Sequence, residues 1–184
     1  MFHFPVPRRP PIRPNLPTFV YGEGVYSLEE IDRINAIAES QPARRVVVGK
    51  DLTYKPEGNR SHLRRVEPTR ENQWVYQKLI DAISILNANT YQYDITGTDE
   101  PLYHVTYDGA EQGHYAWHAD LGNDQQAQRK LSITFQMSDP DEYEGGDLEF
   151  NGTGQVQVAP KKKGQLILFP SYVLHRVTPV TKGV

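Results

Sequence analysis

The sequence predicts an α+β protein that is mainly β, with two N-terminal helices packed on a C-terminal domain of two β layers. Three observations support this class. Apolar residues recur at helical spacing in the first half of the chain, short strand-like runs follow after Tyr91, and Gly, Pro and Asp separate those runs. Regularly spaced short strands of this kind are typical of a β-sandwich or β-barrel.

Residues 1–17 differ in composition from the rest of the chain, because they hold six of its 14 prolines. Such a segment favours an extended, polyproline-type arm. It is either a loosely held terminus or an arm that packs on the domain or on a partner. No repeat or linker divides the remainder, so we expect a single domain over residues 18–184.

The first helix is predicted over residues 28–40. Ser27 followed by Glu30 is a capping box, in which each side chain satisfies a backbone N–H at the helix start. Apolar side chains then recur at helical spacing, which favours a helix. They are Leu28, Ile31, Ile34 and Ile37.

A short strand is expected next, at residues 45–48, followed by a polar and basic loop over 50–65. A second helix is predicted over residues 71–88. Its core-facing side chains would be Trp74, Leu79, Ile80, Ile83 and Leu86.

The second half of the chain consists of short strand-like runs separated by turn residues. The predicted strands are 102–107, 113–119, 130–138, 146–150, 155–159, 165–169 and 173–178.

The overall composition excludes several classes of protein. With 184 residues, 38% hydrophobic and 23% charged, the chain suits one domain with a substantial core. The net charge of −3 creates no general attraction to nucleic acid or anionic membrane. No apolar run approaches the roughly 20 residues that a membrane helix needs. Cysteine is absent, which excludes disulfides and thiolate ligands and fits the cytoplasmic location that we expect.

His118-Ala119-Asp120 places two potential metal ligands two residues apart. On a strand, residues i and i+2 point to the same face, so the imidazole and the carboxylate would project together. His175 follows a second apolar strand after a short turn. Two His and one carboxylate on one face leave several positions of an iron ion open. The spacing alone also fits a hydrogen-bonded structural pair, so the metal hypothesis depends on the surrounding motifs.

Ordered motifs surround these three residues at regular spacing. They are Tyr107 with Gly109, Tyr115–Asp120, Arg129–Leu148, Gly164–Pro170, and His175 with Pro179–Gly183. Together they resemble the 2-oxoglutarate/Fe(II)-dependent dioxygenase superfamily, in particular the prolyl 4-hydroxylase-like branch and its PKHD-type hydroxylases. The resemblance extends into the first half, where Glu71–Trp74 open a helix as in those hydroxylases.

The resemblance implies a fold, a cofactor and a reaction. The fold is a double-stranded β-helix, or jelly-roll, core with helices on one side. His118, Asp120 and His175 would bind Fe(II), with 2-oxoglutarate and O2 as co-substrates and ascorbate as a candidate accessory reductant. The reaction is hydroxylation of a C–H bond, with release of succinate and CO2. Asp120 argues against the halogenating relatives, which have a small residue at this position.

Five further residues are implied to contact the co-substrate: Tyr107, Thr134, Gln136, Leu148 and Val177. Tyr107 matches a tyrosine whose hydroxyl donates to 2-oxoglutarate, although a core aromatic is the alternative. The row of Ser132, Thr134 and Gln136 would face the barrel interior, although polar residues on a strand also suit a solvated face. Leu148 and Val177 would form apolar walls.

The family's cation for the distal carboxylate of 2-oxoglutarate lies about ten residues after the second His, because a buried carboxylate needs a charged partner. In this sequence that position falls just beyond Val184. We expect either a C-terminal strand carrying the cation after Val184, or a protein that ends here without it. Lys182 is the nearest cation, but its position along the strand does not suit the role.

The surroundings of the triad leave further alternatives open. Tyr115 and Trp117 could line the substrate mouth, although the parity of Trp117 also suits packing behind the strand. Arg129 is either structural or faces the substrate. The basic loop at 50–65 lies where related hydroxylases carry a mobile lid, and a solvated loop is the alternative.

We expect a prolyl, peptide, protein or amino-acid-like substrate, or another small molecule, and no membrane partner. A nucleic-acid demethylase of the same superfamily is one alternative, opposed by the acidic net charge and the lack of an aromatic base-stacking loop. A jelly-roll module that binds metal without turnover is another, and the missing cation is its support. The sequence does not predict an oligomeric state.

Overall fold

Two helices and thirteen strands make up the computed structural model, which describes residues 16–46, 55–98 and 100–184. The helices are α1 (Leu28–Glu39) and α2 (Gln73–Asn89). The strands are β1 (Val20–Gly22), β2 (Arg44–Arg45), β3 (Asn59–Arg60), β4 (His62–Val66), β5 (Leu102–Thr106), β6 (His114–His118), β7 (Leu131–Phe135), β8 (Glu144–Gly145), β9 (Leu148–Asn151), β10 (Gln157–Val158), β11 (Leu166–Pro170), β12 (Leu174–Val177) and β13 (Val180–Lys182). Among these residues, no helix is both long and apolar enough to span a membrane.

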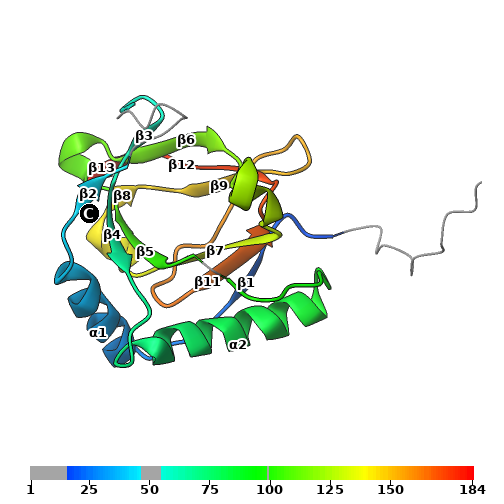
Figure 1. Ribbon diagram of the computed structural model, residues 1–184. Helices are drawn as coiled ribbons and strands as arrows, with labels where there is room; N and C mark the ends of the chain where they lie inside the picture. Colours follow the sequence, from blue (N-terminus) through cyan, green and yellow to red (C-terminus); the bar gives the residue numbers. More distant parts are fainter. Residues whose placement is uncertain (1–15, 47–54, 99) are drawn as a thin grey trace, which may run out of the picture.

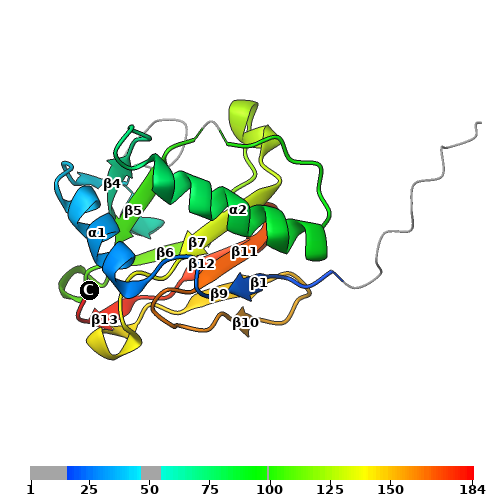
Figure 2. The same cartoon turned by 90° about the horizontal axis from the view of Figure 1, so that it is seen from below.

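The strands pair antiparallel and form layers. One sheet has the order β10-β9-β12-β6-β3 and a second the order β1-β11-β7, with two smaller sheets, β2-β4-β5 and β13-β8. In Figure 1 the layer of β6, β12 and β9 lies above β7, β11 and β1, and both helices lie below. Figure 2, seen from below, shows α2 crossing β7 and β11. The prediction of a mainly β protein with two helices is confirmed, but α1 contacts β4 and α2 contacts β1, which belong to different sheets.

The helices attach through their own apolar cluster, which we call the helix–sheet cluster. Its buried members are Tyr26, Ile31, Ile34 and Val75, and packed against them are Val25, Trp74, Tyr76, Leu102, Phe135 and Met137. Members from β5 and from β7 therefore meet the same helices.

The predicted capping box begins α1, since Glu30 N–H donates to Ser27 Oγ and Ser27 N–H donates to Glu30 Oε2.

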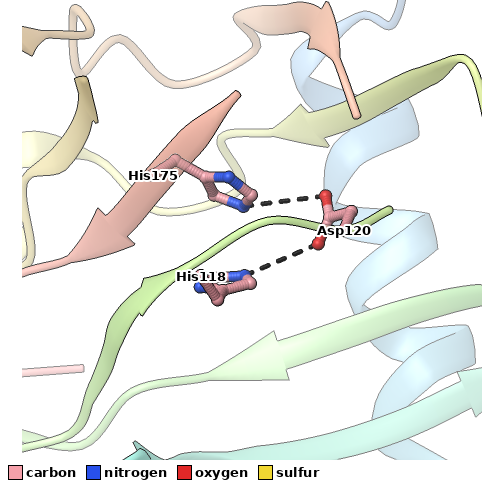
Figure 3. A group of neighbouring side chains, drawn as sticks. All are labelled: His118, Asp120 and His175. Atoms are coloured by element: carbon pink, nitrogen blue, oxygen red, sulfur yellow. Dashed lines mark ion pairs between the residues drawn. The ribbon is translucent and has the colours of Figure 1, made fainter. Parts of the chain in front are cut away.

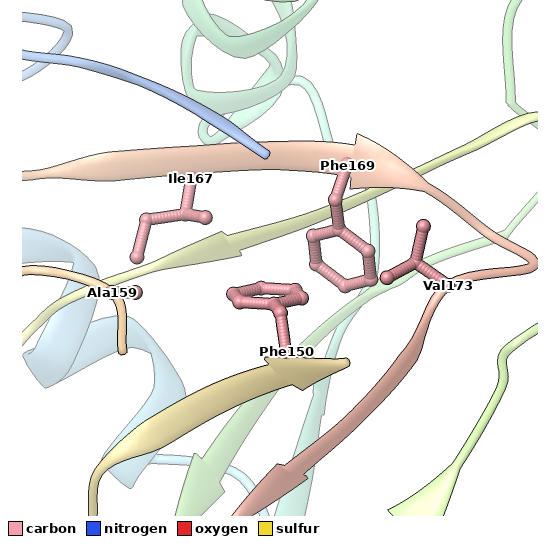
Figure 4. Close-up of a cluster of buried hydrophobic side chains, with 5 residues drawn as sticks. All are labelled: Phe150, Ala159, Ile167, Phe169 and Val173. Carbon is pink, nitrogen blue, oxygen red and sulfur yellow. The ribbon is translucent and has the colours of Figure 1, made fainter. Parts of the chain in front are cut away.

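A second cluster, the inner core, lies between the two main layers (Figure 4). It contains Phe150 from β9, Ile167 and Phe169 from β11, and Ala159 and Val173. The rings of Phe150 and Phe169 lie 4.8 Å apart in an edge-on arrangement. Because the layers are joined here, the inner core sets how far β9 and β12 lie from β11.

The predicted elements are confirmed in the second half of the chain, where a strand lies within or overlaps each of the seven predicted runs. β11 is buried at every position, which explains its unbroken apolar sequence: alternate side chains face the inner core and the helices. Both helices are confirmed to within two residues. Ile80 was expected in the core, but its side chain is 39% exposed on α2.

The loop predicted over residues 50–65 is wrong in its second half. β3 and β4 form there, and β4 is the central strand of the β2-β4-β5 sheet. The prediction failed because charged residues suggested a solvated segment, whereas the aliphatic part of an Arg side chain can lie along a sheet. The predicted strand at 45–48 appears as β2, at Arg44–Arg45. Residues 47–54 and residues 1–15 of the predicted arm lie outside the described residues.

Gly145 shows why two glycines precede Asp147. Its backbone φ is +79°, in the left-handed region that favours glycine. A Cβ there would lie 2.1 Å from the carbonyl oxygen of Pro179. Glycine therefore allows β8 to approach β13, where Gly145 pairs with Val180.

Removal of the Phe150 ring tests the inner core. We expect Phe150→Ala to lower the free energy of unfolding by about 3–5 kcal/mol, because Phe150 is fully buried and the change leaves a cavity. Urea denaturation followed by circular dichroism measures the change. Val158→Ala on β10 is the control: Val158 is 54% exposed, so its loss should stay below about 0.5 kcal/mol. Equal losses in the two variants would contradict this account.

Candidate metal centre

The pairing of β12 with β6 brings two histidines from distant parts of the chain together. His175 is the register partner of His118, so both side chains project from the same face of the sheet. Asp120 lies just after the end of β6. Figure 3 shows the carboxylate of Asp120 beside the two imidazoles, with one oxygen directed at each.

The three side chains form a compact set of potential ligands. His118 Nε2 lies 3.5 Å from Asp120 Oδ1, and His175 Nε2 lies 3.6 Å from Asp120 Oδ2. One ligand atom from each residue lies within 4.8 Å of the others. Metal–nitrogen bonds of about 2.1 Å would place neighbouring ligand atoms about 3 Å apart, so small movements suffice to bind one ion. Sequence reasoning predicted all three residues.

Both imidazoles are oriented by hydrogen bonds at their other nitrogen. His118 Nδ1 lies 2.8 Å from the carbonyl oxygen of Ala116, and His175 Nδ1 lies 2.9 Å from that of Val173. A carbonyl only accepts, so each Nδ1 must carry the proton and donate it. The other ring nitrogen, Nε2, then faces Asp120 in both histidines. Such a bond at the second nitrogen is the usual way in which proteins orient a metal-binding histidine.

Burial determines the charge state of the histidine on β12. His175 is 7% exposed, and its ring packs edge-on against Phe169 at 4.7 Å. Burial lowers the pKa of His175 and nearby His118 lowers it further, while Asp120 and the bond to Val173 oppose this. His175 is therefore neutral at neutral pH, which is the form that binds a metal.

Asp120 is held in its ionised form. Burial alone would raise its pKa, but hydrogen bonds from His118 and Ser132, and the nearby His175 ring, lower the pKa overall. Its backbone is also tied down, because the N–H groups of Asp120 and Leu121 both donate to the carbonyl oxygen of Ser171, at 3.0 and 2.9 Å. The result is an anionic oxygen donor next to two imidazole nitrogens.

A β-bulge in β6 adds Tyr115 to this face. His175 pairs with His118 and Val177 pairs with Tyr115, so a step of two residues on β12 matches three on β6. The Tyr115 ring consequently stacks on the His118 ring, with centroids 3.5 Å apart. Strict alternation would have placed Tyr115 on the opposite face, so the sequence pattern did not reveal this contact.

The polar row on β7 faces the same interior. Ser132 pairs with Phe169 and Thr134 pairs with Ile167, and paired residues share a face. Both partners belong to the inner core. Phe135, which follows Thr134 and points to the opposite face, packs in the helix–sheet cluster. The register therefore turns Ser132 and Thr134 inward, as the family resemblance implies.

The other proposed co-substrate residues lie around this interior. Leu148 and Val177 pair with each other beside the pair of Phe150 and His175, so they share its face. Burial raises the pKa of Tyr107, and nearby Tyr115 and Asp120 raise it further. Tyr107 is thus protonated and close to the triad.

Gln136 lies at the far end of the polar row. Its Nε2 donates to Tyr143 Oη at 2.9 Å and to the carbonyl oxygen of Ser138 at 3.1 Å. These contacts place Gln136 beside the turn that precedes β8.

Two other residues considered from the sequence lie away from the triad. Trp117 faces outward, where the guanidinium of Arg176 lies 4.8 Å from its ring. Lys182 pairs with Glu144 at 2.9 Å, and its side chain is 75% exposed.

Sequence reasoning missed the contact of Ser171 with Asp120, because Ser171 acts through a backbone carbonyl that any residue type could supply.

Comparison with known proteins identifies the family that this site resembles. Residues 103–184 match the 2OG-Fe(II) oxygenase superfamily. A PKHD-type hydroxylase from Acidovorax ebreus is 42% identical over 80 residues, which are 40% of this chain and 35% of the relative. The chain therefore spans about a third of the length of that relative. Residues 103–184 are related to this superfamily and to its PKHD-type hydroxylases, as the motifs predicted.

Solved structures share the fold over most of the chain. A prolyl-4-hydroxylase from Pseudomonas putida has a TM-score of 0.66 at 14% identity, covering 90% of this chain and 86% of the other. A prolyl hydroxylase from Trichoplax adhaerens, in complex with a hypoxia inducible factor oxygen degradation domain peptide fragment, has a TM-score of 0.72 at 16% identity, covering 90% and 79%.

Replacing a triad residue tests whether the three form one metal site. We expect His175→Ala to weaken Co(II) binding by more than about 100-fold, because removing a ligand should cost more than removing its supporting contacts. Co(II) is added to the purified protein and its visible absorption is titrated. His114→Ala is the control, since His114 contacts the backbone oxygens of Gln112 and Glu57. Unchanged affinity in His175→Ala would rule out the site.

Proposed function

We propose that this protein is an Fe(II)- and 2-oxoglutarate-dependent dioxygenase that hydroxylates a C–H bond and releases succinate and CO2. The observation that carries the proposal is the convergence of His118, Asp120 and His175 on the interior of the β layers. Two imidazoles and one carboxylate are the donor set that suits non-haem Fe(II) and leaves positions open for other ligands.

The surrounding residues have distinct proposed roles. His118, Asp120 and His175 would hold the iron from one side only. Tyr107 would donate a hydrogen bond from its protonated hydroxyl to the co-substrate, with Thr134 and Gln136 along the polar row. Leu148 and Val177 would exclude water from the same region. Together, bound iron, 2-oxoglutarate and O2 supply the oxidising power for hydroxylation, and ascorbate would serve as an accessory reductant.

A peptide, protein or amino-acid-like substrate, with proline as the first candidate residue, is the substrate class that we propose. The support is the fold shared with two prolyl hydroxylases, one of them in complex with a peptide fragment. We also propose that residues 18–184 form a single domain with a double-stranded β-helix core, which the stacking of antiparallel layers supports.

Two steps with the same sample test the proposed function. Anaerobic addition of Fe(II) and 2-oxoglutarate should produce a visible charge-transfer band, and admission of O2, with and without ascorbate, should then produce succinate. Asp120→Ala should lose both signals. Absence of the band and of succinate in the wild-type protein would refute the proposal. A band without succinate, for every peptide and nucleic-acid substrate tried, would favour a binding module.

Tyr107→Phe separates co-substrate binding from metal binding. Because only the hydroxyl is removed, we expect the KM for 2-oxoglutarate to rise about 10- to 100-fold, in line with the loss of one hydrogen bond to a charged group. Affinity for Co(II) should stay unchanged. The measurement is succinate formation at varied 2-oxoglutarate. An unaltered KM would show that Tyr107 is a core aromatic only.

A further inference from the structure

Arg129 joins three parts of the chain at the edge of the metal centre. Its Nη1 donates to the backbone carbonyl oxygen of Asp120 at 2.9 Å. On its other side, Nε and Nη2 donate to the two carboxylate oxygens of Glu100 at 2.6 and 2.5 Å. This fork-to-fork arrangement fixes the guanidinium plane, and with it the donor that meets Asp120.

Asp120 needs such a contact because it lies beyond the end of β6. His118 is held by the pairing of β6 with β12, whereas the strand pairing of β6 stops before Asp120. The backbone N–H of Asp120 is anchored on Ser171. Its carbonyl oxygen is anchored on Arg129. The two contacts hold the peptide groups on either side of the Asp120 Cα, and so set the direction in which its side chain leaves the backbone.

We propose that Arg129, held by Glu100, is a positioning residue that fixes the carboxylate of Asp120 for metal binding. The inference rests on the metal site of the proposed function and adds two residues to it. Neither residue donates an atom to the metal, so both act through the backbone of Asp120. Contacts of this kind typically change metal affinity about 10- to 100-fold when they are removed.

If the pair of Arg129 and Glu100 had a purely structural role, its removal would change the stability of the protein and not its metal affinity. The Arg129 side chain is 27% exposed and that of Glu100 is 47% exposed, and ion pairs of this exposure contribute little to stability. The chain contains a matched pair for comparison. Arg45 and Glu111 are also bidentate, at 3.0 and 2.8 Å, with side chains 44% and 33% exposed, and they join β2 to the turn before β6.

The test compares Arg129→Gln, Arg129→Lys and Glu100→Gln with the control Arg45→Gln. Each full-length protein is titrated with Co(II), and its thermal unfolding is measured without metal. We expect Arg129→Gln to bind Co(II) about 10- to 100-fold more weakly. Arg129→Lys should recover part of this loss, because Lys keeps one donor but not the planar fork. Arg45→Gln should bind like the wild-type protein.

A double variant establishes that Glu100 acts through Arg129. Glu100→Gln alone should weaken Co(II) binding, but adding it to Arg129→Gln should cause no further loss, because the two residues form one unit. Full additivity would remove Glu100 from the proposal.

Two outcomes overturn the role of Arg129. In the first, Arg129→Gln binds Co(II) as the wild type does, whatever its melting temperature. In the second, Arg45→Gln loses as much affinity as Arg129→Gln, which indicates a general effect of removing an ion pair. Both leave the proposed function intact, provided that the wild-type protein binds Co(II) and forms succinate. Failure of the wild-type protein itself would instead count against the proposed function.

Discussion

The register of β12 on β6 is the constraint on which the site depends. It sets His175 opposite His118, and a shift by one residue would turn one imidazole to the outer face of the sheet. The inner core supports this register from the interior face, because Phe150 is the partner of His175 on β9 and Phe169 packs against the same imidazole. Apolar packing between the layers therefore holds the ligand geometry as well as the fold.

The same packing determines the chemistry of the donors. Desolvation beside Phe169 keeps His175 neutral, and the opposed effects on Asp120 leave its carboxylate ionised. His175 and Asp120 therefore need not release protons at neutral pH before they bind a divalent cation. The hydrogen bonds at both Nδ1 atoms complete this preparation, because they turn each Nε2 toward Asp120.

Residues whose role follows from a local pattern could be predicted from the sequence. The capping box at Ser27, the strand runs after Tyr91 and the spacing of His118 and Asp120 are of this kind. Three features could not be predicted, because each depends on contacts between distant segments. The bulge in β6 brings Tyr115 onto His118, the charged strand β4 is held by two partners, and Ser171 contributes only its carbonyl oxygen.

The site combines firmly held donors with partial access to solvent. The His175 side chain is 7% exposed, whereas those of His118 and Asp120 are 18% and 27% exposed. The two histidines are held by the pairing of β12 with β6, and Asp120, beyond the end of β6, is held through its backbone. Under the proposed function, exchange of co-substrate and product requires access to the metal, and retention of the metal requires that the donors do not move. Strand pairing and backbone contacts meet the second requirement without closing the site to solvent.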